Sequence, residues 1–155
     1  MAVATHLGPW LLGTVKDTTG TTAGTIRNIG ATPVQQYKAI TFADATAATQ
    51  AFVLPAGAFI SAFSFITTTV FSAATTIKCS IGATDLTAAT TITSVAPANM
   101  AIASTSGATA LAVNVGSTDA IVTFTLVPGV STTGAGTLVV AYTVRNSDGT
   151  YGAAN

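Results

Sequence analysis

The stretch LPAGAFISAFSFITTTVFSAATTIKCSIGA, residues Leu54–Ala83, holds the densest concentration of core-forming side chains in this sequence. Its opening LPAG supplies a proline and a glycine that end one strand and turn the chain. The aromatic and β-branched mixture that follows is typical of a second strand. Apolar side chains fill both of its faces, at odd positions Phe59, Phe63, Phe65 and Phe71 and at even positions Ile60, Ile66 and Val70. We therefore predict that this strand lies in the middle of a packed sheet with both faces apolar.

Strand patterns recur on both sides of this stretch. Before it come YKAITF at 37–42, the loop DATAAT, and QAFVL at 50–54. After the central strand come TIKCSIG at 76–82, a weak strand near 91–95, LAVNV at 111–115, AIVTFTLV at 120–127 and TLVVAYTV at 137–144, whereas PANMAIASTSGA at 97–108 suggests only a helical turn. About eight strands at intervals of roughly 8–15 residues predict an all-β fold, a single β-sandwich or jelly roll, rather than βαβ units.

Charged residues are scarce and evenly balanced. They make up 6% of the 155 residues and give a formal net charge of zero. The acids are isolated aspartates in turn-like surroundings, at Asp17, Asp44, Asp85, Asp119 and Asp148. The bases are equally scattered, at Lys16, Arg27, Lys38, Lys78 and Arg145. Because no basic cluster exists to hold a phosphate backbone, we do not expect nucleic acid to be a partner.

The mean hydropathy of +0.62 is high, and the chain has few charges. A small soluble monomer relies on a charged surface to stay dispersed, so we expect copies of the chain or a larger object to cover some apolar surface. No apolar run reaches the ~18–20 residues of a membrane-spanning helix, and we expect no membrane partner. The start MAVATHLGPWLLG lacks a positively charged segment and is interrupted by Gly8 and Pro9, which favours synthesis in the cytoplasm without a signal peptide.

Residues 1–36 differ in composition from residues 37–155. They are rich in glycine and threonine, and their only concentrated apolar group is Pro9, Trp10, Leu11 and Leu12. Such a segment cannot build a core alone, so we predict an extended N-terminal arm followed by a sandwich domain at 37–155. Trp10 either anchors the arm on a neighbouring surface, as buried tryptophans do at interfaces, or folds back onto its own domain. These four residues are the candidate interface anchor.

Groups that could carry catalysis are few. His6, the only histidine, falls in the predicted arm, where no triad geometry could hold it. Cys79, the only cysteine, lies on the apolar side of its strand and reads as a small buried hydrophobe without a disulfide partner. One histidine and one cysteine cannot form a structural zinc site, and Asp85 and Asp148 fit turns that need no calcium. We predict that the chain is not an enzyme and has no catalytic residue, cofactor or metal.

Several segments together resemble a known group of proteins. They are LPAGAFI, TTTVFSAATT, IGATD, GAGTLVVAYTV and the opening GPWLLGTVKDTTGTTAGTIRN. This combination resembles small structural proteins of tailed bacteriophages, which are β-sandwich or jelly-roll proteins on or near the capsid. Many of them are decoration (cement) proteins, and some are fibre or head-associated modules.

The resemblance implies a non-enzymatic virion protein that binds the major capsid protein on the outside of the phage head and stabilises contacts between capsid subunits. It also fits a closed homo-oligomer, for which we favour a trimer. A head fibre, tail or adaptor module of the virion is the alternative. A carbohydrate-binding jelly roll is a third reading, which requires exposed aromatic side chains and could use Tyr37, Tyr142 and Tyr151.

Overall fold

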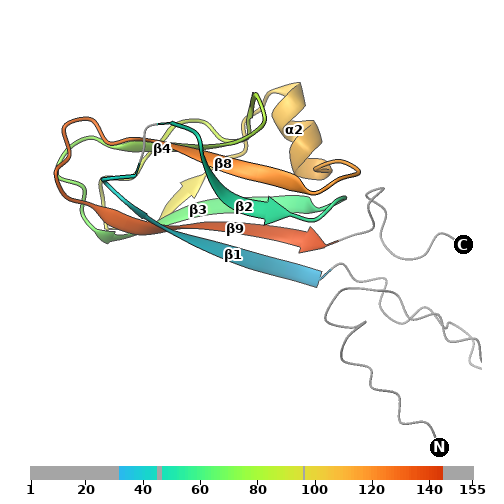
Figure 1. The fold of residues 1–155 in the computed structure, drawn as a ribbon, viewed down its shortest axis with the longest axis horizontal. Helices are drawn as coiled ribbons and strands as arrows, with labels where there is room; N and C mark the ends of the chain where they lie inside the picture. Colours follow the sequence, from blue (N-terminus) through green and yellow to red (C-terminus); the bar gives the residue numbers. More distant parts are fainter. Residues whose placement is uncertain (1–31, 45–46, 96, 145–155) are drawn as a thin grey trace, which may run out of the picture.

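Two antiparallel β-sheets packed face to face form the body of the molecule (Figure 1). The structure, a computed structural model, describes residues 32–44, 47–95 and 97–144. The first sheet has the order β1 (Thr32–Thr41), β9 (Ala135–Val144), β3 (Phe59–Thr69) and β7 (Ala98–Met100). The second has the order β2 (Thr49–Leu54), β8 (Ala120–Val127), β4 (Thr76–Ile81) and β5 (Thr84–Asp85), with β6 (Thr90–Thr91) also paired to β4.

The chain crosses from one sheet to the other at almost every connection. The strands β1, β3, β7 and β9 lie in the first sheet, and β2, β4, β5, β6 and β8 lie in the second. The resulting orders, β1-β9-β3-β7 over β2-β8-β4-β5, are those of a jelly roll. The predicted all-β sandwich is confirmed.

The first strand begins earlier than the sequence suggested. β1 pairs with β9 without interruption from Thr32↔Val144 to Thr41↔Ala135. Residues 32–36 therefore belong to the sheet and not to the arm that we predicted for 1–36. The segment was misread because Gln36, a polar residue, occupies an inward position between the sheets, where its amide is hydrogen-bonded. The rest of the predicted arm lies outside the described residues.

The central strand β3 lies between β9 and β7, as predicted, but only one of its faces is buried. Phe63 and Phe65 are 1% and 0% exposed, whereas Ile66 on the opposite face is 41% exposed. The pairing with β9 shifts between Ile60 and Ala62. This bulge changes the parity of the strand, so even-numbered Ile60 and odd-numbered Phe63 both face the core. The prediction of two packed faces was wrong, because the second sheet covers only one face of this strand.

A helix, α2 (Ser106–Val113), replaces most of the strand that we predicted at 111–115. Thr105 caps its N-terminus, because the threonine side chain accepts a hydrogen bond of 3.3 Å from the Ala108 backbone N–H. Ala108 and Ala112 are its buried residues. The helical turn that we expected within 97–108 corresponds to the start of α2 at Ser106, whereas the first part of that segment forms β7. No helix in the described ranges has the length and apolar character needed to cross a membrane.

Both sheets contribute large side chains to a continuous core. The strands of the first sheet supply Phe63, Phe65, Leu138 and Val140, and those of the second supply Phe52, Leu54, Val122, Phe124 and Leu126. The rings of Phe65 and Phe71 lie with their centroids 6.2 Å apart. β8 spans the predicted 120–127, with its even-numbered residues buried and Ile121 and Val127 exposed, as the alternation indicated.

Candidate functional site

The predicted arm anchor, Pro9, Trp10, Leu11 and Leu12, lies outside the described residues, as does His6. Its role in binding stays a prediction. The residues that the structure does describe show the surroundings of Cys79, of three aspartates and of two tyrosines, and they define the surfaces of the sandwich.

Cys79 has the environment of a core residue. It lies on β4 with no exposed surface, and burial raises the pKa of its thiol to about 12. Desolvation disfavours the thiolate, which is the nucleophilic and metal-binding form of cysteine. The thiol is therefore protonated at neutral pH, and the prediction of a buried hydrophobe is confirmed.

Asp85 is tied into the β4–β5 hairpin. Its Oδ2 accepts a hydrogen bond of 2.8 Å from Lys78 Nζ, and its Oδ1 accepts one of 2.8 Å from Ser80 Oγ. These two bonds lower the pKa of the Asp85 carboxyl below its ordinary value. The carboxylate is thus held by its own hairpin, in agreement with the turn-forming role that we predicted.

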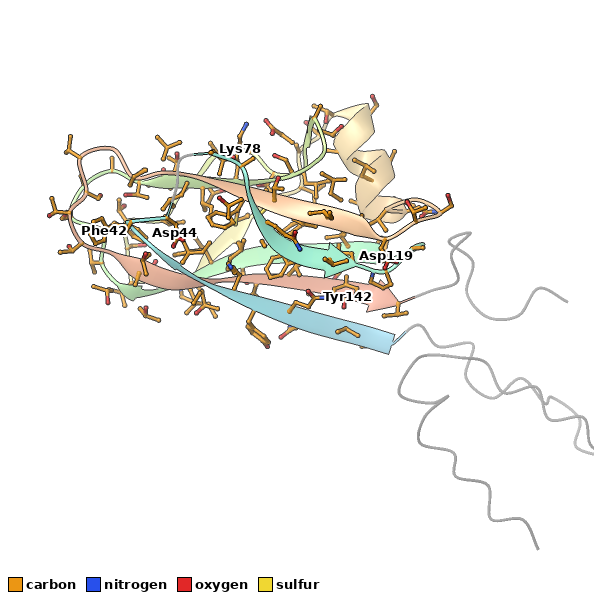
Figure 2. The ribbon with its side chains drawn as sticks, viewed as in Figure 1. Phe42, Asp44, Lys78, Asp119 and Tyr142 are labelled. Atoms are coloured by element: carbon orange, nitrogen blue, oxygen red, sulfur yellow. The ribbon has the colours of Figure 1, made fainter. Side chains whose placement is uncertain are left out.

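The other two described aspartates accept hydrogen bonds from backbone N–H groups. Asp44 Oδ2 accepts a hydrogen bond of 2.6 Å from the Thr41 N–H, and Asp119 Oδ1 accepts one of 3.1 Å from the Ala56 N–H. Figure 2 shows Asp44 and Asp119 at opposite ends of the sandwich. Within the described ranges, no three His, Cys, Asp or Glu side chains come together as a metal site would require, and no pocket is present.

The outer face of the β1-β9-β3-β7 sheet differs from the other described surfaces in its lack of charged residues. Its residues are identified by the strand register, since they pair with one another and alternate with core residues. None of them is charged. We call this set the uncharged face: Gln35, Tyr37 and Ala39 on β1; Thr137, Val139, Ala141 and Thr143 on β9; Phe59, Ala62, Ser64 and Ile66 on β3; and Asn99 on β7.

Val139 lies at the centre of the uncharged face. Its partners in the register are Tyr37 on one side and Ser64 on the other. Val139 is only 6% exposed although it takes no part in the core between the sheets, so its neighbours on the face cover it. Tyr37 is 62% exposed, and its hydroxyl donates a hydrogen bond of 2.6 Å to Gln35 Oε1. The face thus presents a tethered aromatic ring beside small and apolar side chains.

The described charges lie elsewhere on the molecule. Lys78 and Asp85 belong to the second sheet, and Figure 2 shows Lys78 on the side away from β1 and β9. Asp44 and Asp119 lie in loops at the two ends. Lys38 pairs with Leu138, a core residue, and so lies on the inward side of edge strand β1. The outer face of the second sheet therefore carries charged side chains, whereas that of the first sheet carries none among its described residues.

Tyr142 is not a surface aromatic, contrary to our expectation for a carbohydrate-binding site. It is 5% exposed, and its hydroxyl accepts a hydrogen bond of 2.8 Å from Gln36 Nε2. The same Gln36 nitrogen donates to the Val53 carbonyl oxygen at 3.0 Å, which links β1 of the first sheet to β2 of the second. Tyr37 keeps its exposure, and Tyr151 lies outside the described residues.

Sequence reasoning did not find the uncharged face. The alternation in TLVVAYTV separated Leu138, Val140 and Tyr142 from Val139 and Ala141, but both sets are apolar. The face emerges only from the pairing of β9 with β1 and β3, whose partners lie far away in the sequence. The available signal was the absence of charge from the outward positions of all three strands.

Neither a family model, nor a curated protein, nor a solved structure matches this chain.

Proposed function

We propose that this chain is a non-enzymatic structural protein of a tailed-phage virion, a capsid decoration protein that binds the outside of the head and stabilises contacts between major capsid subunits. The uncharged face is the observation that carries this proposal. It is a broad sheet surface suited to contact with another protein, and its chemistry is that of packing rather than of proton transfer or metal binding.

The physical argument rests on the cost of desolvation. Burying an unpaired charge is expensive, whereas hydroxyl, amide and apolar groups can be covered at small cost when their hydrogen bonds are kept. Exposed Tyr37 and Ile66 add apolar area that gains roughly 25 cal/mol for each Å² removed from water. Even a modest gain for each copy, repeated over a shell, stabilises the particle.

The fold supports the same interpretation. Jelly rolls occur in viral capsid and lectin domains, and a rigid sandwich can present one whole sheet face to a neighbour. Of the three tyrosines considered for a glycan site, Tyr142 is buried. This observation weakens the carbohydrate-binding alternative without bearing on assembly. A place in a head fibre, tail or adaptor uses the same kind of contact and differs only in location on the particle.

The test uses particles produced from the genome that encodes the chain, with its gene intact and with its gene deleted. We expect many copies of the chain in purified intact particles. We also expect that deleted particles release DNA at a lower temperature, and that added purified chain restores the difference. Purified particles that contain no copy of the chain would overturn the proposal. Copies confined to the tail or to a fibre would favour the adaptor alternative.

A further inference from the structure

We infer that the uncharged face packs against the same face of a second copy, so that two chains form a two-fold pair. This inference rests on the proposed function, since both assign the uncharged face to assembly. It goes further by naming a second copy, rather than the major capsid protein, as the occupant of this face, so that contact with the head falls to another part of the chain.

The absence of charge from the face makes a second copy a suitable occupant. Two uncharged faces can be apposed without stripping water from an ion or breaking an ion pair. The chain as a whole has a formal net charge of zero, so copies do not repel one another at long range. The opposite sheet, with the half-exposed Lys78–Asp85 pair on its outer side, would have to desolvate that pair in the same arrangement.

The relief of the uncharged face fits a self-complementary contact. Along one register row, Ala141 lies between Gln35 and Ala62, which leaves a low strip across the central strands. In the neighbouring row, the exposed ring of Tyr37 stands at the edge and is tethered to Gln35. In a two-fold arrangement, the tyrosine ring of each copy lies over the low strip of its partner. Tyrosine is a common anchor at such interfaces, because it buries much area for few rotatable bonds.

The size of the face sets the expected strength. Three long strands spaced about 4.8 Å apart, each of about 10 residues, present roughly 450 Å² of sheet, and two copies bury about twice that area. This total lies near the lower limit of specific protein interfaces, about 1,000 Å². The pair is therefore a reversible dimer whose population rises with concentration.

A single patch that binds itself closes as a two-fold pair, whereas a ring of three needs two different patches on each chain. The uncharged face therefore favours an even number of copies over the trimer that the sequence suggested.

The decisive variants carry opposite charges at one position. Ala141 lies in the low strip of the face, one register row from the central Val139, and a longer side chain there extends into solvent in the isolated chain. Ala141→Glu and Ala141→Lys should each raise the dissociation constant of the pair about tenfold or more, because each buries an unpaired charge in the contact and brings two like charges close together across the two-fold axis. An equimolar mixture of the two variants should regain association. Thr125→Glu, on the central strand β8 of the opposite sheet, is the matched control and should leave association unchanged.

Sedimentation velocity over a wide concentration range measures these effects on the full chain, and circular dichroism checks that each variant is folded. A chain that stays monomeric throughout, a trimer, or a Thr125→Glu variant weakened as much as Ala141→Glu would overturn the inference. The particle experiment separates its failure from that of the proposed function. If the chain is a monomer but still binds particles that lack it, only the inference of a two-fold pair is refuted. If purified particles contain no copy of the chain, the proposed function is refuted.

Discussion

The ring of Phe65 occupies the space in which any side chain at Gly136 would lie. A Cβ atom at position 136 would stand 2.3 Å from Phe65 Cε1 and 2.6 Å from the Ile66 carbonyl oxygen. Gly136 belongs to β9 and pairs with Thr67 of the neighbouring strand β3. The close contact between β9 and β3, on which both the core and the uncharged face depend, therefore requires glycine at this position.

Gly136→Ala should lower the free energy of unfolding by about 2 kcal/mol, because the ring and the strand must shift to admit one methyl group. Urea denaturation monitored by circular dichroism measures the change. Gly107→Ala is the matched control, since its added Cβ meets only Thr84 Cγ2 at 3.4 Å and replaces glycine within helix α2. We expect that variant to be as stable as the parent or slightly more stable. Equal losses in both variants would contradict the packing argument.

The hydrogen bonds of Gln36 connect the two sheets at their β1–β2 edge. Tyr142→Phe removes the hydroxyl that accepts a hydrogen bond from Gln36 Nε2 and should cost about 1 kcal/mol of unfolding free energy. Gln36→Leu removes this bond and the bond to the Val53 carbonyl oxygen, and should cost more. A double-mutant cycle with both changes should show coupling of about 0.5 kcal/mol or more. Strictly additive losses would mean that the two side chains act independently.

The sequence predicted the fold class because most strands alternate clearly between core and outward residues. AIVTFTLV is the clearest case, since its even-numbered side chains are buried as the pattern indicated. The errors have local causes. The bulge after Ile60 cannot be recognised from the composition of β3. The apolar segment that resembled a strand at 111–115 lies for most of its length in helix α2, whose N-terminus Thr105 caps. The two-residue strands β5 and β6 are too short to show any periodicity.

The Cys79 thiol should be inert while the chain is folded. Burial raises its pKa to about 12, so the thiolate is scarce at neutral and mildly alkaline pH, and no surface of the residue is exposed. A disulfide reagent such as Ellman's should react with it only as fast as the chain opens. Addition of denaturant should restore the rate of a free thiol. Rapid, complete reaction of the native chain would show that β4 is less buried than described.

The Lys78–Asp85 pair should make a small, pH-dependent contribution to stability. Because the hydrogen bonds in the folded chain lower the pKa of Asp85, the contribution is present above the ordinary carboxyl pKa of 3.8 and is lost as the pH falls through the lower folded value. The pair is half-exposed, so we expect less than about 1 kcal/mol, reduced further by salt. Urea titrations at neutral and acidic pH should show Asp85→Asn less stable than the parent only at neutral pH. A difference that persists in strong acid would argue against the ion pair.

The candidate site was harder to predict than the fold. Cys79 and Asp85 could be interpreted from their own neighbours in the sequence, and the structure agrees with those interpretations. The uncharged face could not, because it is assembled from four strands, and nothing in the sequence distinguishes Val139 from the core valine that follows it in the same strand. Only the register with Tyr37 and Ser64 shows that this valine lies on the outside of the sheet.

Electron cryomicroscopy of particles from the genome that encodes the chain tests the central claim most directly. We predict density for this jelly roll on the outer surface of the head, with the β1-β9-β3-β7 face, marked by Tyr37 and Val139, packed against protein. Particles without such density, or with that face open to solvent and the Lys78–Asp85 face buried in its place, would contradict the account.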